Sequence, residues 1–397
     1  MTSDQLPEGI EGECHPRFAA IAWILAEQLT ARQHHGAAIA VHHRGVPVVD
    51  IWGGSRGAAG TETPWTSDTL VLSFSTTKGV AATALHMAME RAGLSYDTPV
   101  HEVWPDFLDG GTGGPFKKDG ITIRHVLCHE AGIPNIRDVV DDVAEIGDWD
   151  HMIGVLNGME PLWEPGTANG YHAVTFGWLV GELVHRLDGR SFTAFLAEEI
   201  VAPLELDGMF VGVPSDEQHR VAPLQTEMIK EGPDIAALLG EDHLLFRSLS
   251  PPGDVEAWLN TPQGMGSCVP SFTGCFTARS LSRLYACLER GGTLDGVRLL
   301  SPETIATATT VQNTRPDLVL FVPINWKLGF ISGGASLSPA GPNPEAFGHS
   351  GLGGSLAFAD PKAEVSVAVT LDLLARDILS DDRAMRIAHA AVAASSS

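Results

Sequence analysis

The stretch Ser75-Thr76-Thr77-Lys78 opens a run of residues with helical apolar spacing, which we expect to form a helix to about Ala92. Gly93 follows where a C-cap glycine belongs. Three residues span nearly one helical turn, so Ser75 and Lys78 point the same way. A serine becomes a good nucleophile when a nearby base takes its proton, and a helix N-terminus offers N–H groups to an oxyanion. In isolation the pattern also occurs by chance, with Ser75 as a simple N-cap, so further motifs have to decide.

Two later segments carry polar residues in Gly-rich turns. Residues 165–173 (PGTANGYHA) place Tyr171 after a Pro-Gly turn and before an apolar stretch that we expect to be helical at 176–187. Residues 347–354 (FGHSGLGG) form a predicted turn that leads into a strand at 355–359. The chain therefore presents a Ser/Lys pair, a tyrosine and a Gly-rich turn in a defined order.

In this order and spacing the chain resembles the serine β-lactamase and penicillin-binding-protein superfamily, whose signatures are S-x-x-K, a tyrosine-containing motif and a K-T-G-like motif. Residues 126–134 (VLCHEAGIP) resemble its LLxHxSGLP loop, and residues 200–206 (IVAPLEL) resemble its I-x-x-P-L-G-M segment. The resemblance covers residues 15–390. It implies a β-lactamase-like fold and a covalent acyl-enzyme on serine.

The resemblance also implies roles for individual residues. Ser75 would form the acyl-enzyme, Lys78 would assist its deprotonation, and Tyr171 would protonate the leaving group and activate the deacylating water. The backbone N–H groups of Ser75 and Leu352 would form the oxyanion hole. A lysine at its ordinary pKa is mostly protonated at neutral pH. The base is therefore either Lys78 with a lowered pKa or Tyr171 as a phenolate, and the sequence leaves both open.

Two departures from the superfamily pattern bear on the substrate. The second motif reads Tyr171-His172-Ala173 where related β-lactamases have Tyr-x-Asn, and the third reads His349-Ser350-Gly351 in place of Lys-Thr-Gly. The missing amide and lysine would hold a β-lactam or a peptide terminus. This pattern is similar to family VIII carboxylesterases and to acyltransferases of the same fold. We expect His349, Ser350 and Gly351 to bind substrate, although His349, which is only partly charged near neutral pH, could equally be a packing residue.

We therefore predict a serine hydrolase that cleaves small to medium carboxylic esters through an acyl-Ser75 intermediate. The alternatives are an acyltransferase that uses the same acyl-enzyme, a β-lactamase or D-amino-acid peptidase, and a non-catalytic binding protein on this scaffold. The intact Ser75, Lys78 and Tyr171 argue against the last. Six tryptophans are candidate pocket walls, with core packing as their commoner role: Trp52, Trp65, Trp149, Trp163, Trp258 and Trp326.

Strand patterns cluster at the two ends of the chain. We predict an α/β (α+β) domain from residues 1–95 and 325–397, in which both ends build one antiparallel sheet flanked by helices. Residues 96–324 would form a mainly helical domain with long loops, and the active site would lie between the two. The expected elements are helices at 15–31 and 381–394, a hairpin of 37–41 and 46–52, a loop at 53–60, strands at 328–331, 355–359 and 365–371, and a turn at 360–363.

Other candidate sites are weak. Ser55 lies in a G-x-S-x-G pattern (53–57), but loop-forming residues follow it where a nucleophile elbow needs a helix, so we interpret it as a turn serine. The adjacent pairs His34-His35 and His42-His43 would point to opposite faces of a strand, and His129-Glu130 lacks the second histidine of H-E-x-x-H. We expect no metal and no cofactor.

The formal net charge of −24 over 397 residues disfavours nucleic acid and anionic membranes as partners. No stretch is apolar enough for a membrane span, and the first residues lack the features of a signal peptide. The cysteines, five in number, do not suggest a disulfide framework. We expect a cytoplasmic protein that acts on a small ester, and the sequence leaves the oligomeric state open.

Overall fold

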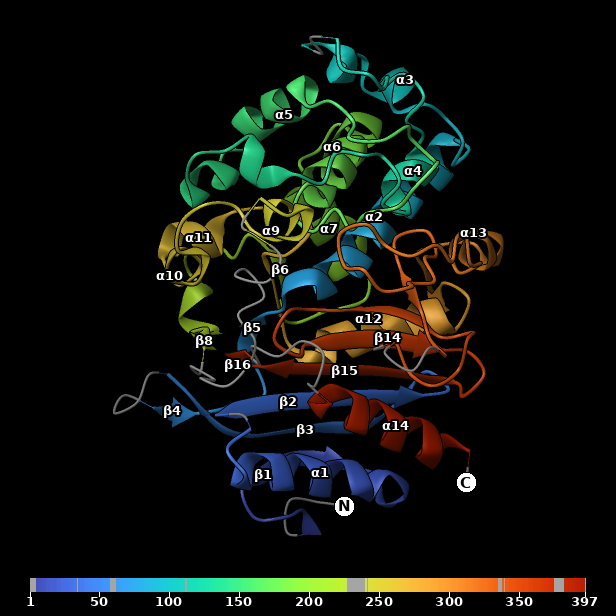
Figure 1. Cartoon of the computed structure of the whole chain (residues 1–397). Helices are drawn as coiled ribbons and strands as arrows, with labels where there is room; N and C mark the ends of the chain where they lie inside the picture. Colours follow the sequence, from blue (N-terminus) through green and yellow to red (C-terminus); the bar gives the residue numbers. More distant parts are fainter. Residues whose placement is uncertain are drawn as a thin grey trace.

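The computed structural model describes residues 5–396 except 34, 58–61, 111–112, 227–239, 241, 335–337, 339 and 375–381. Its centre is an antiparallel sheet with the strand order β1-β3-β2-β15-β14-β13-β12, and β4 pairs with β3 (Figure 1). Strands from both chain ends meet where β15 pairs with β2, as predicted. The strands are β1 (Ile10–Cys14), β2 (Gly36–His43), β3 (Val46–Arg56), β4 (Thr63–Pro64), β12 (Ile331–Ser332), β13 (Phe347–Ser350), β14 (Leu356–Asp360) and β15 (Val365–Leu371).

Helices cover both faces of this sheet. α1 (Ala19–Thr30) and α14 (Arg383–Ser395) pack on one face and on each other, and α12 (Ala278–Glu289) packs on β2, β14 and β15 from the other face (Figure 1). Every residue of β15 is buried, because the strand lies at the centre of the sheet under helices on both sides. The central strands are therefore rich in apolar residues, although β15 also buries Ser366 and Thr370.

Three local predictions for the sheet were wrong. The expected loop at 53–60 is strand as far as Arg56, so Ser55 is a strand residue that pairs with Pro64 of β4 and not a turn serine; residues 58–61 lie outside the described part. Residues 347–350, expected to be turn, form β13. The strand expected at 328–331 reaches regular pairing only in β12, at Ile331–Ser332. The glycines in these segments are typical of turns and loops, so the sequence did not indicate the strands that form by pairing with a neighbouring strand.

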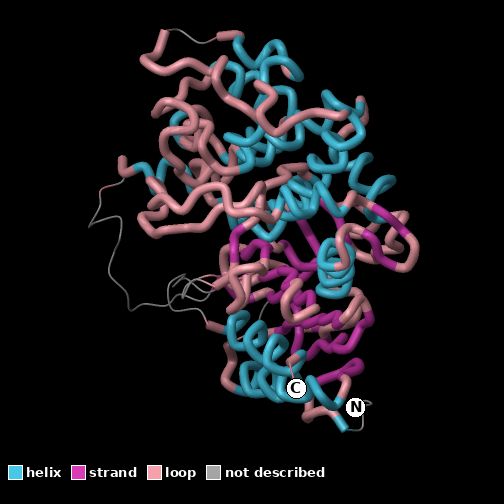
Figure 2. The backbone as a smooth tube through the Cα atoms, turned by 90° about the vertical axis from the view of Figure 1, so that its right-hand side faces the viewer, coloured by secondary structure: helices cyan, strands magenta, loops and turns pink. Residues whose placement is uncertain are grey.

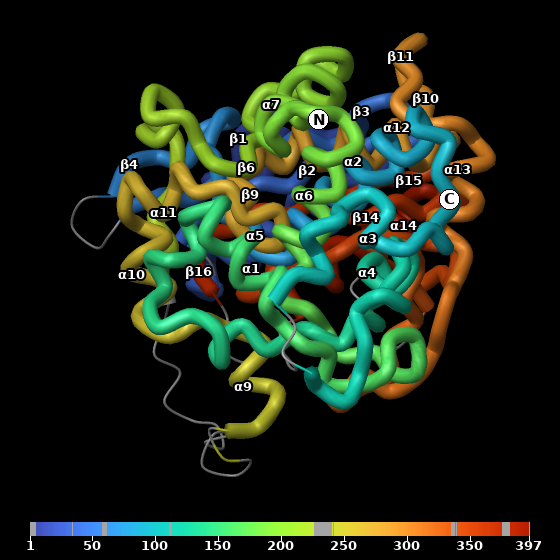
Figure 3. The backbone as a smooth tube through the Cα atoms, turned by 90° about the horizontal axis from the view of Figure 1, so that it is seen from above, coloured from blue at the N-terminus to red at the C-terminus, as the bar shows by residue number. Residues whose placement is uncertain are grey.

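The middle of the chain is mainly helical. Figure 2 shows many helices at the end of the molecule away from the strands. Looking down on this end, α2 and α6 lie side by side near the centre (Figure 3). The prediction missed a small sheet of order β6-β9-β5-β7, whose strands are only two or three residues long. Its strands are β5 (Leu70–Leu72), β6 (Met209–Val211), β7 (Val221–Ala222) and β9 (Gly274–Phe276).

The helices of this part of the molecule are α2 (Thr77–Ala92), α3 (Val100–Val103), α4 (Ile123–Leu127), α5 (Trp149–Gly158), α6 (Phe176–Asp188), α7 (Phe192–Leu196), α9 (Leu244–Leu249), α10 (Val255–Leu259), α11 (Pro262–Gly266) and α13 (Pro302–Ala308).

The domain boundaries placed at 95 and 325 remain a prediction. Two short pairs complete the strand inventory of the described residues: β10 (Thr293–Leu294) with β11 (Val297–Arg298), and β16 (Leu373–Leu374) with β8 (Gln225–Thr226). β16 and β8 join the C-terminal strand region to the helical part, and α12 from the middle of the chain lies on the sheet. Chain position alone therefore does not separate the two parts.

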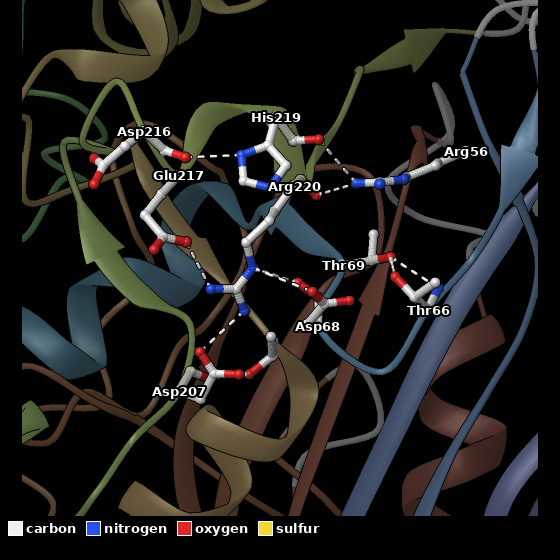
Figure 4. A network of polar contacts seen from close by, with 10 residues as sticks. Arg56, Thr66, Asp68, Thr69, Asp207, Asp216, Glu217, His219 and Arg220 are labelled. Atoms are coloured by element: carbon white, nitrogen blue, oxygen red, sulfur yellow. Dashed lines mark hydrogen bonds and ion pairs between the residues drawn. The ribbon is translucent and has the colours of Figure 1, made fainter.

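A polar network anchors the segment that leads to the S-x-x-K motif (Figure 4). The buried Arg220 guanidinium donates to the backbone carbonyl of Asp68 at 3.0 Å and to the carboxylates of Glu217 and Asp207 at 2.7 and 3.1 Å. Arg56 in turn donates to the carbonyl of Arg220 at 2.5 Å. These bonds tie β3, the start of β5 and β7 together.

We expect Arg220→Ala to lower the free energy of unfolding by about 2 kcal/mol, because the substitution removes a buried guanidinium together with its hydrogen bonds to Asp68, Glu217 and Asp207. The control is Arg386→Ala, which removes a more exposed pair with Glu27 and should cost about 0.5 kcal/mol. Urea titrations of both variants measure the difference. Equal losses would show that the Arg220 network contributes no more than a surface ion pair.

In the described part of the chain, no helix combines the length and the apolar character that crossing a membrane requires. The same residues contain no group of three or more His, Cys, Asp or Glu side chains arranged to hold a metal ion. His34 of the pair His34-His35 lies outside the described residues.

Candidate active site

Ser75 is held at a strained turn between β5 and α2. Phe74, the preceding residue, has a φ of 44°, a left-handed conformation that a bulky aromatic residue rarely adopts. The turn (Phe74–Thr76) is a short 3₁₀ helix that runs directly into α2. Ser75 lines the main pocket. Backbone strain of this kind is often found at functional sites, and nothing in the residue pattern signals it.

Lys78 is completely buried one turn further along α2. Its Nζ lies 3.1 Å from the Ser75 Oγ, and it donates to the carbonyl oxygens of Ala173 and Ser271 at 2.7 and 3.1 Å. The sequence predicted the contact with Ser75 but not the two carbonyls, which come from segments 95 and 193 residues away in the chain. A neutral amine has two N–H bonds for these carbonyls and keeps its lone pair for the serine hydroxyl.

Burial holds the pKa of Lys78 well below its ordinary value, because the charged form loses its hydration. Tyr171 lies next to it, with Nζ 4.8 Å from the ring centroid. Burial raises the pKa of Tyr171, an interaction with Ser75 lowers it, and the charge of Asp317 raises it further, so the phenol form is favoured. Of the two bases that the sequence left open, these directions favour neutral Lys78 over a Tyr171 phenolate.

The segment that carries Tyr171 is packed among aromatic rings. Trp326 stacks on Tyr171 with ring centroids 5.8 Å apart, and the His129 ring meets its edge at 4.9 Å. His129 has a φ of 60° and accepts a hydrogen bond from the His172 N–H at Nδ1. The loop resemblance at 126–134 therefore marks residues that support the tyrosine, a role that the sequence did not predict.

The third motif lies on β13, next to the serine. The His349 ring is buried and stacks on Tyr171 at 6.2 Å. Burial lowers its pKa to about 3, with the nearby Lys78 acting in the same direction and a bond to the Ser350 carbonyl opposing it. His349 is therefore neutral rather than partly charged, and it provides no cation in place of the missing lysine. Its Nε2 has no hydrogen-bond partner among the described residues.

The turn after β13 fits closely against the serine segment. A Cβ atom on Gly351 would lie 2.1 Å from the carbonyl oxygen of Ser73, so glycine is required there. Ser355 Oγ donates to the same carbonyl at 2.7 Å. Leu352 lines the pocket with Ser75 and is 46% exposed. The turn is thus fixed beside Ser75, and the use of the Ser75 and Leu352 N–H groups as an oxyanion hole stays a prediction.

The pocket has a volume of about 640 Å³. Apolar side chains dominate its walls, among them Leu249, Val255 and Phe272 from one part of the chain and Leu320, Ile324 and Trp326 from another. His349, Ser350 and Gly351 all line it, as their predicted role in substrate binding requires. Of the six candidate tryptophans, Trp326 is in the wall and the others are not among its lining residues.

Fold and site together define a member of the serine β-lactamase class, and comparison with known proteins places the chain in that family. The Beta-lactamase family model matches residues 22–392, so the chain belongs to the β-lactamase family. This confirms the predicted resemblance and the predicted fold.

Individual relatives are more specific. The Mycobacterium tuberculosis protein named esterase/beta-lactamase LipL is 34% identical over 385 residues, which cover 94% of this chain and 85% of that protein. Among solved structures, a family VIII carboxylesterase is 34% identical with a TM-score of 0.86, covering 97% of this chain and 99% of that one. A penicillin-binding-protein homologue from Caulobacter crescentus is 37% identical with a TM-score of 0.83, with the same coverage.

Proposed function

We propose that this protein is a carboxylesterase that hydrolyses neutral esters through an acyl-Ser75 intermediate. The observation that carries the proposal is the contact of 3.1 Å between the Oγ of Ser75, which lines an apolar pocket, and the Nζ of the fully buried Lys78. The relatives named as esterases agree with this activity. The same geometry argues against a non-catalytic binding protein, since a binding pocket has no need of a buried lysine on a serine.

In the acylation step, the neutral amine of Lys78 takes the proton of Ser75 as Oγ bonds to the ester carbonyl carbon. The N–H groups of Ser75 and Leu352 stabilise the oxyanion of the tetrahedral intermediate. The bond to the alcohol oxygen then breaks. That oxygen takes a proton from the Tyr171 phenol, which recovers one from the Lys78 ammonium. The site ends with an ester on Ser75 and a neutral Lys78.

Deacylation repeats these steps with water in place of the alcohol. Tyr171 and Lys78 accept the proton of the attacking water, and Ser75 Oγ leaves with a proton returned by the same pair. Because both side chains are buried, the proton stays within the site between the two steps. An alcohol that occupied the position of the water would receive the acyl group instead, which is the transferase alternative.

The pocket lining supports a neutral, apolar substrate. The described lining contains one acidic side chain, Glu256, and offers no lysine or arginine to an anionic substrate. The neutral His349 offers no cation for the carboxylate of a β-lactam. Both features favour apolar carboxylic esters over β-lactams and peptide termini.

We expect p-nitrophenyl butyrate and octanoate to be hydrolysed at least about tenfold more efficiently than a chromogenic cephalosporin, because the apolar walls suit an acyl chain and the neutral His349 offers no cation to a carboxylate. A tenfold ratio corresponds to about 1.4 kcal/mol of differential transition-state binding. Steady-state kinetics of the wild-type protein with the three substrates test this. Faster turnover of the cephalosporin than of any ester would assign a β-lactamase instead, and a new ester formed from added alcohol would assign a transferase.

Two further parts of the proposal concern the whole chain. A cytoplasmic location is supported by the cysteines, all of which are free thiols. A division into an α/β part (1–95 and 325–397) and a helical part (96–324) is supported by the main sheet, which both chain ends build. The pocket draws its lining from both parts, including Phe272 and His349.

A further inference from the structure

Asp317 is a buried carboxylate that belongs to no motif in the sequence. Its side chain is 1% exposed. The Tyr171 N–H donates to its Oδ1 at 3.0 Å, and the Asn169 amide donates to its Oδ2 at 3.2 Å. An ionised carboxylate is costly to bury unless hydrogen bonds replace its hydration. Both of these bonds cross nearly 150 residues of chain, so the carboxylate joins two distant segments.

The same carboxylate also organises its own loop. Oδ1 accepts hydrogen bonds from the N–H groups of Val319 and Leu320 at 2.9 and 3.0 Å. Leu320 lines the substrate pocket. One oxygen atom therefore accepts from the backbone of the candidate catalytic tyrosine and from the backbone of a pocket wall. Because both segments donate to the same oxygen, a displacement of one segment changes the hydrogen bonds of the other.

Other hydrogen bonds also hold the segment around Tyr171. On the side of Asp317, the Leu318 N–H donates to the Asn169 carbonyl at 2.9 Å. On the other side, His129 accepts two bonds. Gly170 N–H donates to the His129 carbonyl at 2.9 Å, and His172 N–H donates to His129 Nδ1 at 3.1 Å. The Tyr171 N–H between them turns the other way, to Asp317. With both sides held, the ring stays stacked between Trp326 and Lys78 Nζ. Without Asp317, one of three consecutive amides loses its partner in a buried place.

We propose that Asp317 is a positioning residue. It holds the Tyr171 phenol in its position relative to Lys78 and Ser75, and it links this position to that of Leu320 in the pocket wall. The inference rests on the proposed function, because it gives Tyr171 its task in acyl transfer. Asp317 itself touches no reacting atom.

The first test is Asp317→Ala, assayed with p-nitrophenyl acetate and octanoate. We expect kcat to fall about 10- to 100-fold for both esters, since small displacements of a catalytic group cost this much. KM should rise for octanoate more than for acetate, because the longer acyl chain uses the Leu320 wall. A kcat within twofold of wild type would overturn the inference.

Two conservative variants separate geometry from charge, and they keep the test valid if the alanine variant does not fold. Asp317→Asn keeps an oxygen for the three N–H groups. Its amide can donate to Asn169 Oδ1, which has no partner among the described residues, once the Asn169 amide turns by 180° to exchange its oxygen and nitrogen. Asp317→Glu keeps the charge but moves the carboxylate by one methylene. Positioning predicts near-normal kcat in Asp317→Asn and a clear loss in Asp317→Glu. The reverse order would overturn it.

Asp360 provides a matched control. It is fully buried and accepts from the N–H groups of Lys362 and Ala363 and from the Asn343 amide, the same kinds of donor, in the β14–β15 hairpin. Asp360→Ala should lower the melting temperature while kcat per folded molecule stays unchanged. An equal loss of kcat in Asp360→Ala and Asp317→Ala would reduce Asp317 to a structural residue.

Tyr171→Phe distinguishes failure of this inference from failure of the proposed function. Full activity in Tyr171→Phe would overturn this inference together with the proton path through the phenol, whereas the absence of ester hydrolysis by the wild-type protein would overturn the proposed function itself. A large loss in Tyr171→Phe together with normal kinetics in Asp317→Ala would overturn only the positioning role. Parallel losses of kcat in the two variants support both.

Discussion

Ser75→Ala is expected to lower the turnover of p-nitrophenyl esters by about 10⁴- to 10⁶-fold, because the substitution removes the lining hydroxyl that is hydrogen-bonded to Lys78. The Ser75 Oγ is the hydroxyl that contacts the buried Lys78 Nζ. Stopped-flow release of p-nitrophenol and mass spectrometry of the intact protein measure the effect. Wild type should show an initial burst and a mass increase of one acyl group, and the variant should show neither.

The matched control for this experiment is Ser55→Ala. Ser55 also stands in a G-x-S-x-G pattern, but it is a residue of β3 paired with β4. Its replacement should leave kcat/KM within about twofold of wild type, as is usual for substitutions away from the site. Ester turnover that persists in Ser75→Ala and disappears in Ser55→Ala would contradict the proposed mechanism.

Lys78→Met should lower kcat by about 10³-fold, within the range that general base catalysis contributes. Methionine fills a similar volume without a lone pair for the serine proton. Wild-type activity should fall on the acidic side as the amine of Lys78 becomes protonated. The lowered pKa of Lys78 implies that this fall begins well below the ordinary lysine range. Lys78→Met should leave a low rate without this limb, as a pH series of kcat/KM would show.

The same lysine gives a test of stability. Since the pKa of Lys78 is lower in the folded than in the unfolded protein, the unfolded state binds the extra proton between the two values. Stability contributed at this site is therefore lost as pH falls and recovered as pH rises toward the unfolded pKa of about 10.4. Urea unfolding from pH 6 to 10 should show wild type gaining stability relative to Lys78→Met. Parallel pH curves for the two proteins would contradict a lowered pKa.

Much of the site could be predicted because its motifs are local. Ser75 and Lys78 are three residues apart, so the sequence predicts that their side chains point the same way. In the structure Ser75 lies in the 3₁₀ turn that runs into α2, and its Oγ is 3.1 Å from Lys78 Nζ. Gly93 ends that helix with a φ of 65°, as expected for a C-cap glycine. His349 and Tyr171 were identified by resemblance, and the structure brings both rings together. Their catalytic and binding roles remain predictions.

Other features could not be predicted because they depend on contacts between distant segments. The residues 347–350 look like a Gly-rich turn, and only pairing with β14 makes them a strand. His349 looks partly charged in sequence, and only burial beside Lys78 makes it neutral. Asp317 has no motif around it, and only the folded chain brings the Tyr171 N–H to its carboxylate.

The sequence by itself therefore determined the family, the fold class and the chemical type of the candidate residues, since these are written in residue identity and in spacings of a few positions. Only the tertiary structure decided the protonation states, the backbone conformations and the hydrogen-bond partners of those residues. The pKa of Lys78 is lowered because its amine is buried away from water. The segments that carry Ala173 and Ser271, which contact this amine, come much later in the chain. Burial, strain and long-range hydrogen bonds are properties of an arrangement in space, and no short stretch of sequence contains them.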